Sequence, residues 1–116
     1  MTRDANWAAD GAIRVSTMTA AISAARDWID ANAEARPEII LFGGGEIYAQ
    51  GLDYCHRVER TVINIAANGG KGAAFFPDLL ADQWDIKIEA EIDAAGDVPA
   101  YRYERAVRLA AAKPMA

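Results

Sequence analysis

The sequence predicts an α/β fold: a mixed, mostly parallel sheet flanked by helices, with a C-terminal antiparallel hairpin. Three observations support this. A short apolar run at residues 39–42, between Pro37 and Gly43, is typical of a parallel strand buried on both faces. A helix-compatible segment and a second strand candidate follow it, in the order of a βαβ unit. From Trp84 onward, apolar and polar residues alternate with a period of two, as in half-exposed strands.

The N-terminal half contains a short strand candidate and a helix candidate ahead of the apolar run. Residues 12–15 are compatible with a short strand, and residues 18–32 form an amphipathic pattern whose apolar stripe includes Ile22 and Ile29. Thr17 or Thr19 is a suitable N-cap for this helix. The proline at position 37 disfavours helical geometry in the residue before it, so the helix should end earlier.

The C-terminal half predicts a strand, a loop and a hairpin. Residues 58–65 are rich in Val, Ile and Thr and favour a strand. Residues 66–78 carry a glycine cluster and predict a loop. Residues 84–92 alternate, a segment with Gly96 and Pro99 connects, and residues 101–109 alternate again, with Arg105 as the polar exception. We therefore expect one domain at residues 1–109 and a disordered tail at 110–116.

Composition narrows the class of protein. A chain of 116 residues with 53% hydrophobic residues can bury the core of one domain. A net charge of −5 without a basic face argues against nucleic acid, and no apolar run approaches the ~20 residues of a membrane span. No signal-peptide pattern follows Met1, so we expect a cytoplasmic protein. Cys55 and His56 are too few ligands for a metal site, so no metal is predicted.

The glycine triplet at residues 43–45 is the most informative motif. Glycine permits a positive φ and lets another group approach the backbone closely. After a buried strand and before a helix, the triplet would expose backbone N–H groups at the positive end of the helix dipole, which suits a pyrophosphate. It does not match the six-residue dinucleotide fingerprint. A tight strand-to-helix turn with no ligand therefore stays open as the alternative.

Neighbouring motifs point to a family. The segment IILFGGGEIYAQ at residues 39–50, Thr61 in VERTVINI, Phe-Pro-Asp at 76–78, Trp84 and the AYRY sequence at 100–103 occur in the order found in dihydrofolate reductases. The chain thus resembles the C-terminal two-thirds of that family over nearly its whole length. The resemblance implies a partial domain truncated at the N-terminus, without the first strand, the active-site lid and the helix bearing the catalytic acid. Little turnover is then expected of the chain alone.

The resemblance also implies an activity and a site. Family members are oxidoreductases of one-carbon metabolism that transfer hydride from NADPH to 7,8-dihydrofolate, giving tetrahydrofolate. The implied substrate-binding residues are Phe42, Tyr48 and Thr61, the last supporting the missing acid, and no catalytic residue is assigned in this chain. The implied cofactor-binding residues are Gly43 and Gly44 as a cis pair, Gly45, Glu46, Ile47, Tyr48 and Gln50, with Thr2, Arg3 and Thr17 near the 2′-phosphate.

Departures and alternatives accompany this interpretation. The loop at Gly72-Ala73-Ala74 differs from the family pattern, and Asp27, on another helix, is not the missing acid. Tyr48 could simply pack on the sheet, Thr61 could be structural, and Arg3 could be a solvated surface residue. The alternative functions are a non-catalytic NADPH-binding remnant and a pyrimidine reductase of riboflavin synthesis. Open sheet edges would also allow self-association.

Overall fold

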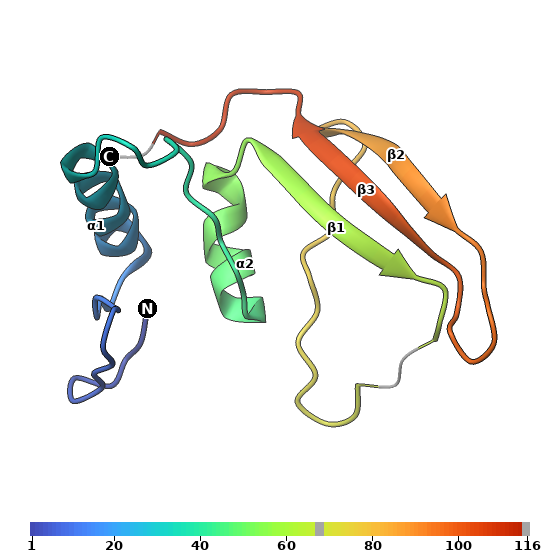
Figure 1. Cartoon of the computed structure of the whole chain (residues 1–116), viewed down its shortest axis with the longest axis horizontal. Coiled ribbons are helices and arrows are strands. Elements are labelled where there is room, and N and C mark those ends of the chain that lie inside the picture. The colour runs from blue at the N-terminus through green and yellow to red at the C-terminus, as the bar shows by residue number, and fades with distance from the viewer. Residues whose placement is uncertain (67–68, 115–116) are drawn as a thin grey trace. The chain divides into compact units, whose positions relative to one another are not determined.

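The computed structural model describes residues 1–66 and 69–114 (Figure 1). These residues divide into two compact units, one formed by Met1–Gly51 with the described C-terminal end and the other by Leu52–Lys113. Of these described residues, the first unit contains two helices, and the second contains a short 3₁₀ helix (Leu52–Tyr54) and three strands. None of the described helices has the combination of length and apolar character needed to cross a membrane.

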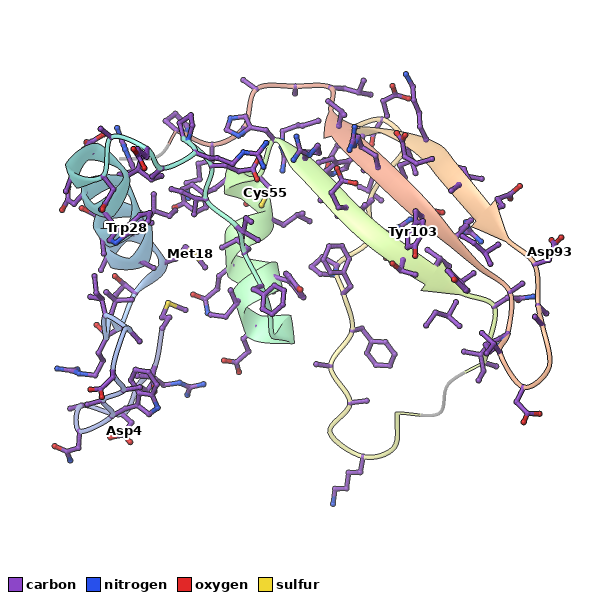
Figure 2. The ribbon with its side chains drawn as sticks, viewed as in Figure 1. Asp4, Met18, Trp28, Cys55, Asp93 and Tyr103 are labelled. Atoms are coloured by element: carbon purple, nitrogen blue, oxygen red, sulfur yellow. The ribbon has the colours of Figure 1, made fainter. Side chains whose placement is uncertain are left out.

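Helix α1 (Met18–Ala31) confirms the predicted helix and its cap. Thr17 has extended backbone geometry, and its Oγ1 accepts a hydrogen bond of 3.1 Å from the Ala20 N–H. The helix ends at Asn32, whose backbone N–H donates to the Ile29 carbonyl over 3.1 Å. Met18 and Ile22 are buried on one face, and Trp28 is exposed on another (Figure 2). The apolar stripe therefore forms only a small core in this unit.

Helix α2 (Gly45–Gly51) follows the glycine turn. Its first turn is closed by the Tyr48 N–H, which donates to the Gly44 carbonyl over 3.0 Å. Its last residue, Gly51, is buried, and a Cβ there would overlap the Leu41 side chain and lie 3.3 Å from the Met18 terminal methyl group. The glycine thus lets the end of α2 approach both α1 and the segment before the turn.

Two predicted strands and the parallel part of the sheet are not confirmed. Residues 12–15 and 39–42 carry no regular secondary structure, and Ile40 and Phe42 are exposed rather than buried. A buried parallel strand needs neighbouring strands at both edges and cover on both faces. The described residues supply no such strands to these segments, and every strand pair among the described residues is antiparallel.

The second unit is built on an antiparallel sheet with the order β1-β3-β2. Strand β1 (Arg57–Ile63) pairs with β3 (Tyr101–Arg108), which also pairs with β2 (Trp84–Ile92) to form the predicted hairpin. A register shift lies between Ile88 and Ala90 of β2. An isolated bridge between Ala95 and Val98 narrows the hairpin connection. The last strand in the sequence is therefore the central strand of the sheet.

The two faces of strand β3 differ in how far they are exposed to solvent. Tyr103 is exposed (Figure 2), whereas Glu104 and Ala106 on the other face are buried. Opposite Arg108, Trp84 of β2 is also buried, and the Arg108 guanidinium lies 4.3 Å from its ring centroid. The covered face is thus partly built from charged side chains.

The structure describes most of the predicted loop at residues 66–78 and of the predicted tail at residues 110–116. Residues 67–68 of the predicted loop and 115–116 of the predicted tail lie outside the described residues. Within the described tail, the Lys113 N–H donates to the Asp53 carbonyl over 2.8 Å, and its ammonium lies 5.1 Å from the Tyr54 ring centroid. The single-domain assignment and the disordered tail stay predictions.

Candidate functional site

The glycine turn lies at the start of α2 and leaves part of its backbone open. Gly43 has a φ of +96°, a conformation that L side chains rarely adopt, and the Gly43–Gly44 peptide bond is cis, as the resemblance implies. A Cβ on Gly43 would lie 3.4 Å from the Tyr48 hydroxyl, so the tyrosine packs against the turn. A Cβ on Gly44 would meet no neighbouring atom within 4 Å among the described residues. The turn can therefore be approached closely at Gly44.

Residues of α2 differ in how they face the solvent. Ile47 and Tyr48 are half-buried, while Glu46 and Gln50 are exposed. Glu46 accepts hydrogen bonds of 3.2 and 3.4 Å from one nitrogen, Nη2, of Arg3. The structure therefore brings Arg3 next to the helix that follows the glycine turn, 43 positions away in the sequence.

The loop that carries Arg3 is held by its neighbours. The Thr2 N–H donates to the Val15 carbonyl over 2.9 Å, and the Thr2 hydroxyl accepts a hydrogen bond of 3.1 Å from the Asp4 N–H. The Thr17 hydroxyl is used in capping α1 and lies 3.4 Å from the Thr19 hydroxyl. Thr2 thus tethers the loop, while Thr17 has a structural role that sequence analysis also predicted.

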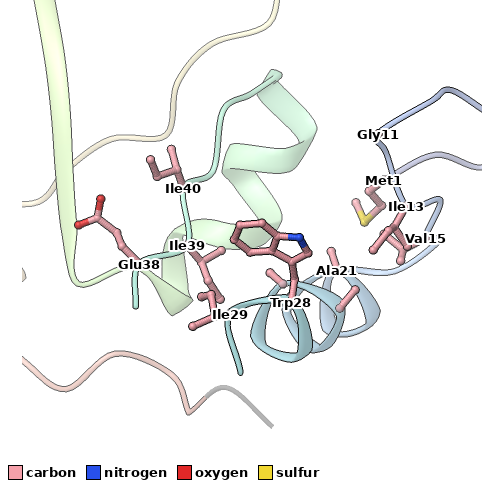
Figure 3. A pocket seen from close by; sticks show the side chains of 12 residues that line it. Met1, Gly11, Ile13, Val15, Ala21, Trp28, Ile29, Glu38, Ile39 and Ile40 are labelled. Carbon is pink, nitrogen blue, oxygen red and sulfur yellow. The ribbon is translucent and has the colours of Figure 1, made fainter. Parts of the chain in front are cut away.

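Apolar side chains are exposed on the segment that precedes the turn. Phe42 is 93% exposed, directly before Gly43. A groove of about 470 Å³ lies between α1, residues 11–15 and residues 38–40, the last of which precede Phe42 closely in the sequence (Figure 3). Its walls are mainly apolar and include Ile13, Val15, Trp28, Ile29 and Ile40, with Glu38 as a charged member. None of the predicted cofactor-binding residues lines this groove.

Thr61, the remaining predicted site residue, belongs to the second unit. It is exposed in β1, directly across from Tyr103 of β3. The Tyr103 ring meets the Tyr101 ring edge-to-face, with centroids 5.8 Å apart. Thr61 therefore lies on an exposed face of the sheet with two tyrosines, and a hydrogen-bonding role for its hydroxyl stays a prediction.

Sequence analysis missed a buried ion cluster in the second unit. Glu104 accepts hydrogen bonds of 2.6 Å from Arg60 Nε and 2.7 Å from Arg102 Nε. Burial alone would raise the pKa of the Glu104 carboxyl, but the hydrogen bonds and charges of the two arginines outweigh burial and lower it. The available signal was Arg60 itself, a charged residue between Val58 and Val62 on one face of β1.

A similar cluster on the other face of the sheet is more exposed. Glu59 lies 2.6 Å from Arg105 Nε and 3.0 Å from Arg57 Nε. Each cluster thus pairs one carboxylate with two arginines, but only Glu104 is withdrawn from solvent. No group of three or more potential metal ligands occurs within residues 1–66 and 69–114.

Comparisons with known proteins relate the chain to one family. A family model described as dihydrofolate reductase matches residues 1–108. Among curated proteins, the chain is 28% identical over 104 residues to the dihydrofolate reductase type 3 of Salmonella typhimurium. The match covers 90% of this chain and 57% of that protein. The chain therefore spans little more than half the length of the curated relative that it matches.

Proposed function

This chain belongs to the dihydrofolate reductase family, and on that premise we propose that it binds NADPH and takes part in reducing dihydrofolate to tetrahydrofolate. The observation that carries the proposal is the glycine turn, whose backbone is open at Gly44 and lies two residues from the partner of Arg3. The family match does not favour the pyrimidine reductase or the non-catalytic remnant. Location in the cytoplasm and a role in one-carbon metabolism belong to the same proposal.

The residues present suit a phosphate-bearing cofactor. The backbone at Gly44 can be approached without meeting a side chain, and Arg3 offers an exposed guanidinium that could grip a phosphate with two donors. When bound, NADPH supplies the hydride. The proposed holders are Gly43 and Gly44 in the turn and the backbone amides of Gly45, Glu46 and Ile47 at the start of the helix. Tyr48 and Gln50 follow along the helix, and Thr2, Arg3 and Thr17 lie toward the 2′-phosphate in this proposal.

The chain's own side chains would position the pterin. We assign Phe42 and Tyr48 to apolar contact with the substrate, because Phe42 is exposed beside the turn and Tyr48 packs against Gly43. Thr61 offers a hydroxyl on an exposed strand, where it could orient a carboxyl group by a hydrogen bond. No residue of this chain is assigned as the proton donor.

The binding proposal is tested with two glycine variants. Gly44→Ala should weaken NADPH binding by about tenfold or more, equivalent to ~1.4 kcal/mol, because the added methyl group blocks close approach to the backbone. Its melting temperature should change little, since the methyl group meets open space. Gly96→Ala, in the hairpin connection, is the control for a loss of stability without a loss of binding: its φ of +57° makes a side chain cost about 1–2 kcal/mol, and NADPH binding should not change.

Calorimetric titration and thermal unfolding of both variants decide the matter. Unchanged NADPH affinity in a folded Gly44→Ala protein would reduce the turn to a structural element. Turnover is followed by the fall in NADPH absorbance. It is measured for the chain alone and for a fusion of the chain with the part of the Salmonella typhimurium dihydrofolate reductase type 3 that lies outside the match. Turnover in neither, with NADPH binding intact, would contradict the reductase function.

A further inference from the structure

We propose that Glu46 competes with the cofactor's 2′-phosphate for Arg3 and so determines the preference between NADPH and NADH. This inference rests on the proposed function and assigns a specificity role within the same site. It starts from a contact that already exists: Arg3 Nη2 lies 3.2 Å from Glu46 Oε2 and 3.4 Å from Oε1. The guanidinium that would bind the phosphate is therefore already paired with a carboxylate.

Both partners are held in place by the backbone. The Arg3 loop is tethered through the Thr2 N–H and the Val15 carbonyl, 2.9 Å apart. Glu46 belongs to α2, whose far end is fixed by the close approach of Gly51 to the Leu41 side chain. The pair thus joins two segments that are each held by the backbone. A phosphate that binds Arg3 would lie close to the negative charge of Glu46 as well as the positive charge of Arg3.

The pair is exposed enough to be exchanged. The Arg3 and Glu46 side chains are 89% and 77% exposed, and ion pairs of this kind contribute little to stability. The contact uses one guanidinium nitrogen, whereas a phosphate can engage two in parallel. A 2′-phosphate should therefore displace the carboxylate, although the Glu46 charge would oppose its approach. The competition of Glu46 for Arg3 and the repulsion between Glu46 and the phosphate both weaken the binding of NADPH.

NADH presents a different group to the same carboxylate. It carries a ribose 2′-hydroxyl where NADPH carries a phosphate, and an acidic side chain is a suitable acceptor for that hydroxyl. Glu46 would thus cost NADPH part of its affinity while tolerating or assisting NADH. The Arg3–Glu46 pair would thus reduce the ratio of the affinity for NADPH to the affinity for NADH.

The test is a titration of the 116-residue chain with NADPH and NADH. Glu46→Gln keeps the shape of the side chain but removes its charge, and it should tighten NADPH about two- to fivefold. NADH should bind equally well or more weakly, so the preference for NADPH rises. Asp30→Asn, which removes an exposed carboxylate from the last turn of α1, is the charge-matched control and should leave the preference unchanged. Combining Glu46→Gln with Arg3→Gln should give a smaller gain than Glu46→Gln alone.

The outcomes separate this inference from the function on which it rests. An equal effect of Glu46→Gln on both nucleotides, or weaker NADPH binding, would overturn the competition while leaving NADPH binding established. Failure of the unmodified chain to bind either nucleotide would instead refute the proposed function and the inference with it. Far-ultraviolet circular dichroism on each variant confirms that changes in affinity do not arise from unfolding, and Glu46→Ala serves as a second variant with the same expected direction.

Discussion

Replacing Glu104 by glutamine should destabilise the second unit far more than the same change at Glu59. Each carboxylate is bonded by two arginines, but the Glu104 side chain is 6% exposed and that of Glu59 is 48% exposed. A hydrogen bond to a charged group contributes about 1.5–3 kcal/mol. In Glu104→Gln one of the two is lost, because an amide has a single acceptor oxygen, and the other loses its charge. Because Arg60 and Arg102 are themselves 34% and 40% exposed, we expect a net loss of about 2 kcal/mol.

Glu59→Gln is the internal control for this experiment. Its ion pairs are exposed, so the expected loss is about 0.5 kcal/mol. Urea unfolding followed by circular dichroism gives the free energy of unfolding of each variant at neutral pH. Equal losses in the two variants would refute the reasoning, since burial is the main difference between the two clusters. A negligible loss in Glu104→Gln would show that the two arginines are solvated as well without the carboxylate.

The cluster of Glu104, Arg60 and Arg102 should also make the free energy of unfolding depend on pH in the acid range. The pKa of Glu104 is lower in the folded chain than its ordinary value, so the folded state binds the proton less readily than the unfolded state does. This contribution to stability is complete above the unfolded pKa, about 4.3, and is lost as the pH falls through the folded pKa. The free energy of unfolding should therefore fall more steeply below about pH 5 in the unmodified chain than in Glu104→Gln. Parallel curves would contradict the assignment.

Three further outcomes are expected. Thr17→Ala should cost about 1 kcal/mol of stability through loss of the α1 cap, whereas Thr19→Ala should cost less, as thermal unfolding would show. Gly51→Ala should lower the melting temperature only slightly, because its methyl group overlaps the movable end of the Leu41 side chain, and Leu41→Ala in the same chain should remove that overlap. Burial raises the pKa of the Cys55 thiol despite the opposing charge of a nearby arginine, so iodoacetamide should alkylate it more slowly in the folded chain than in urea.

Local signals in the sequence predicted the elements that depend on local interactions. Helix α1 has its cap three residues from the N–H group that it binds, and the period-two pattern from Trp84 onward is enough to identify β2. The family was likewise predicted from ordered motifs and is confirmed by the match over residues 1–108. In each case the residues that determine the feature are close together or retain their order along the chain.

Features that depend on distant partners could not be predicted in this way. Residues 39–42 have the composition of a buried strand, but pairing decides whether they form one, and the described chain offers them no partner strand. The burial of Glu104 in β3 could not be predicted from alternation either, because it depends on Arg60, 44 positions away in the sequence. The Arg3–Glu46 pair escaped notice for the same reason, so the glycine turn was found without the carboxylate that bears on its proposed cofactor.

The position of β3 at the centre of the sheet makes the order of synthesis matter. Among residues 1–66 and 69–114, strands β1 and β2 share no ladder with each other, and each pairs with β3 alone. Strand β3 is also the last of the three to leave the ribosome. Until residues 101–108 are made, the backbone N–H and C=O groups of β1 and β2 that will bond to β3 therefore lack their partners. A stop codon before residue 101 would remove the shared partner of both strands, whereas one after residue 108 would spare the whole ladder. Nonsense variants a few codons apart should thus differ sharply in the amount of folded protein that accumulates.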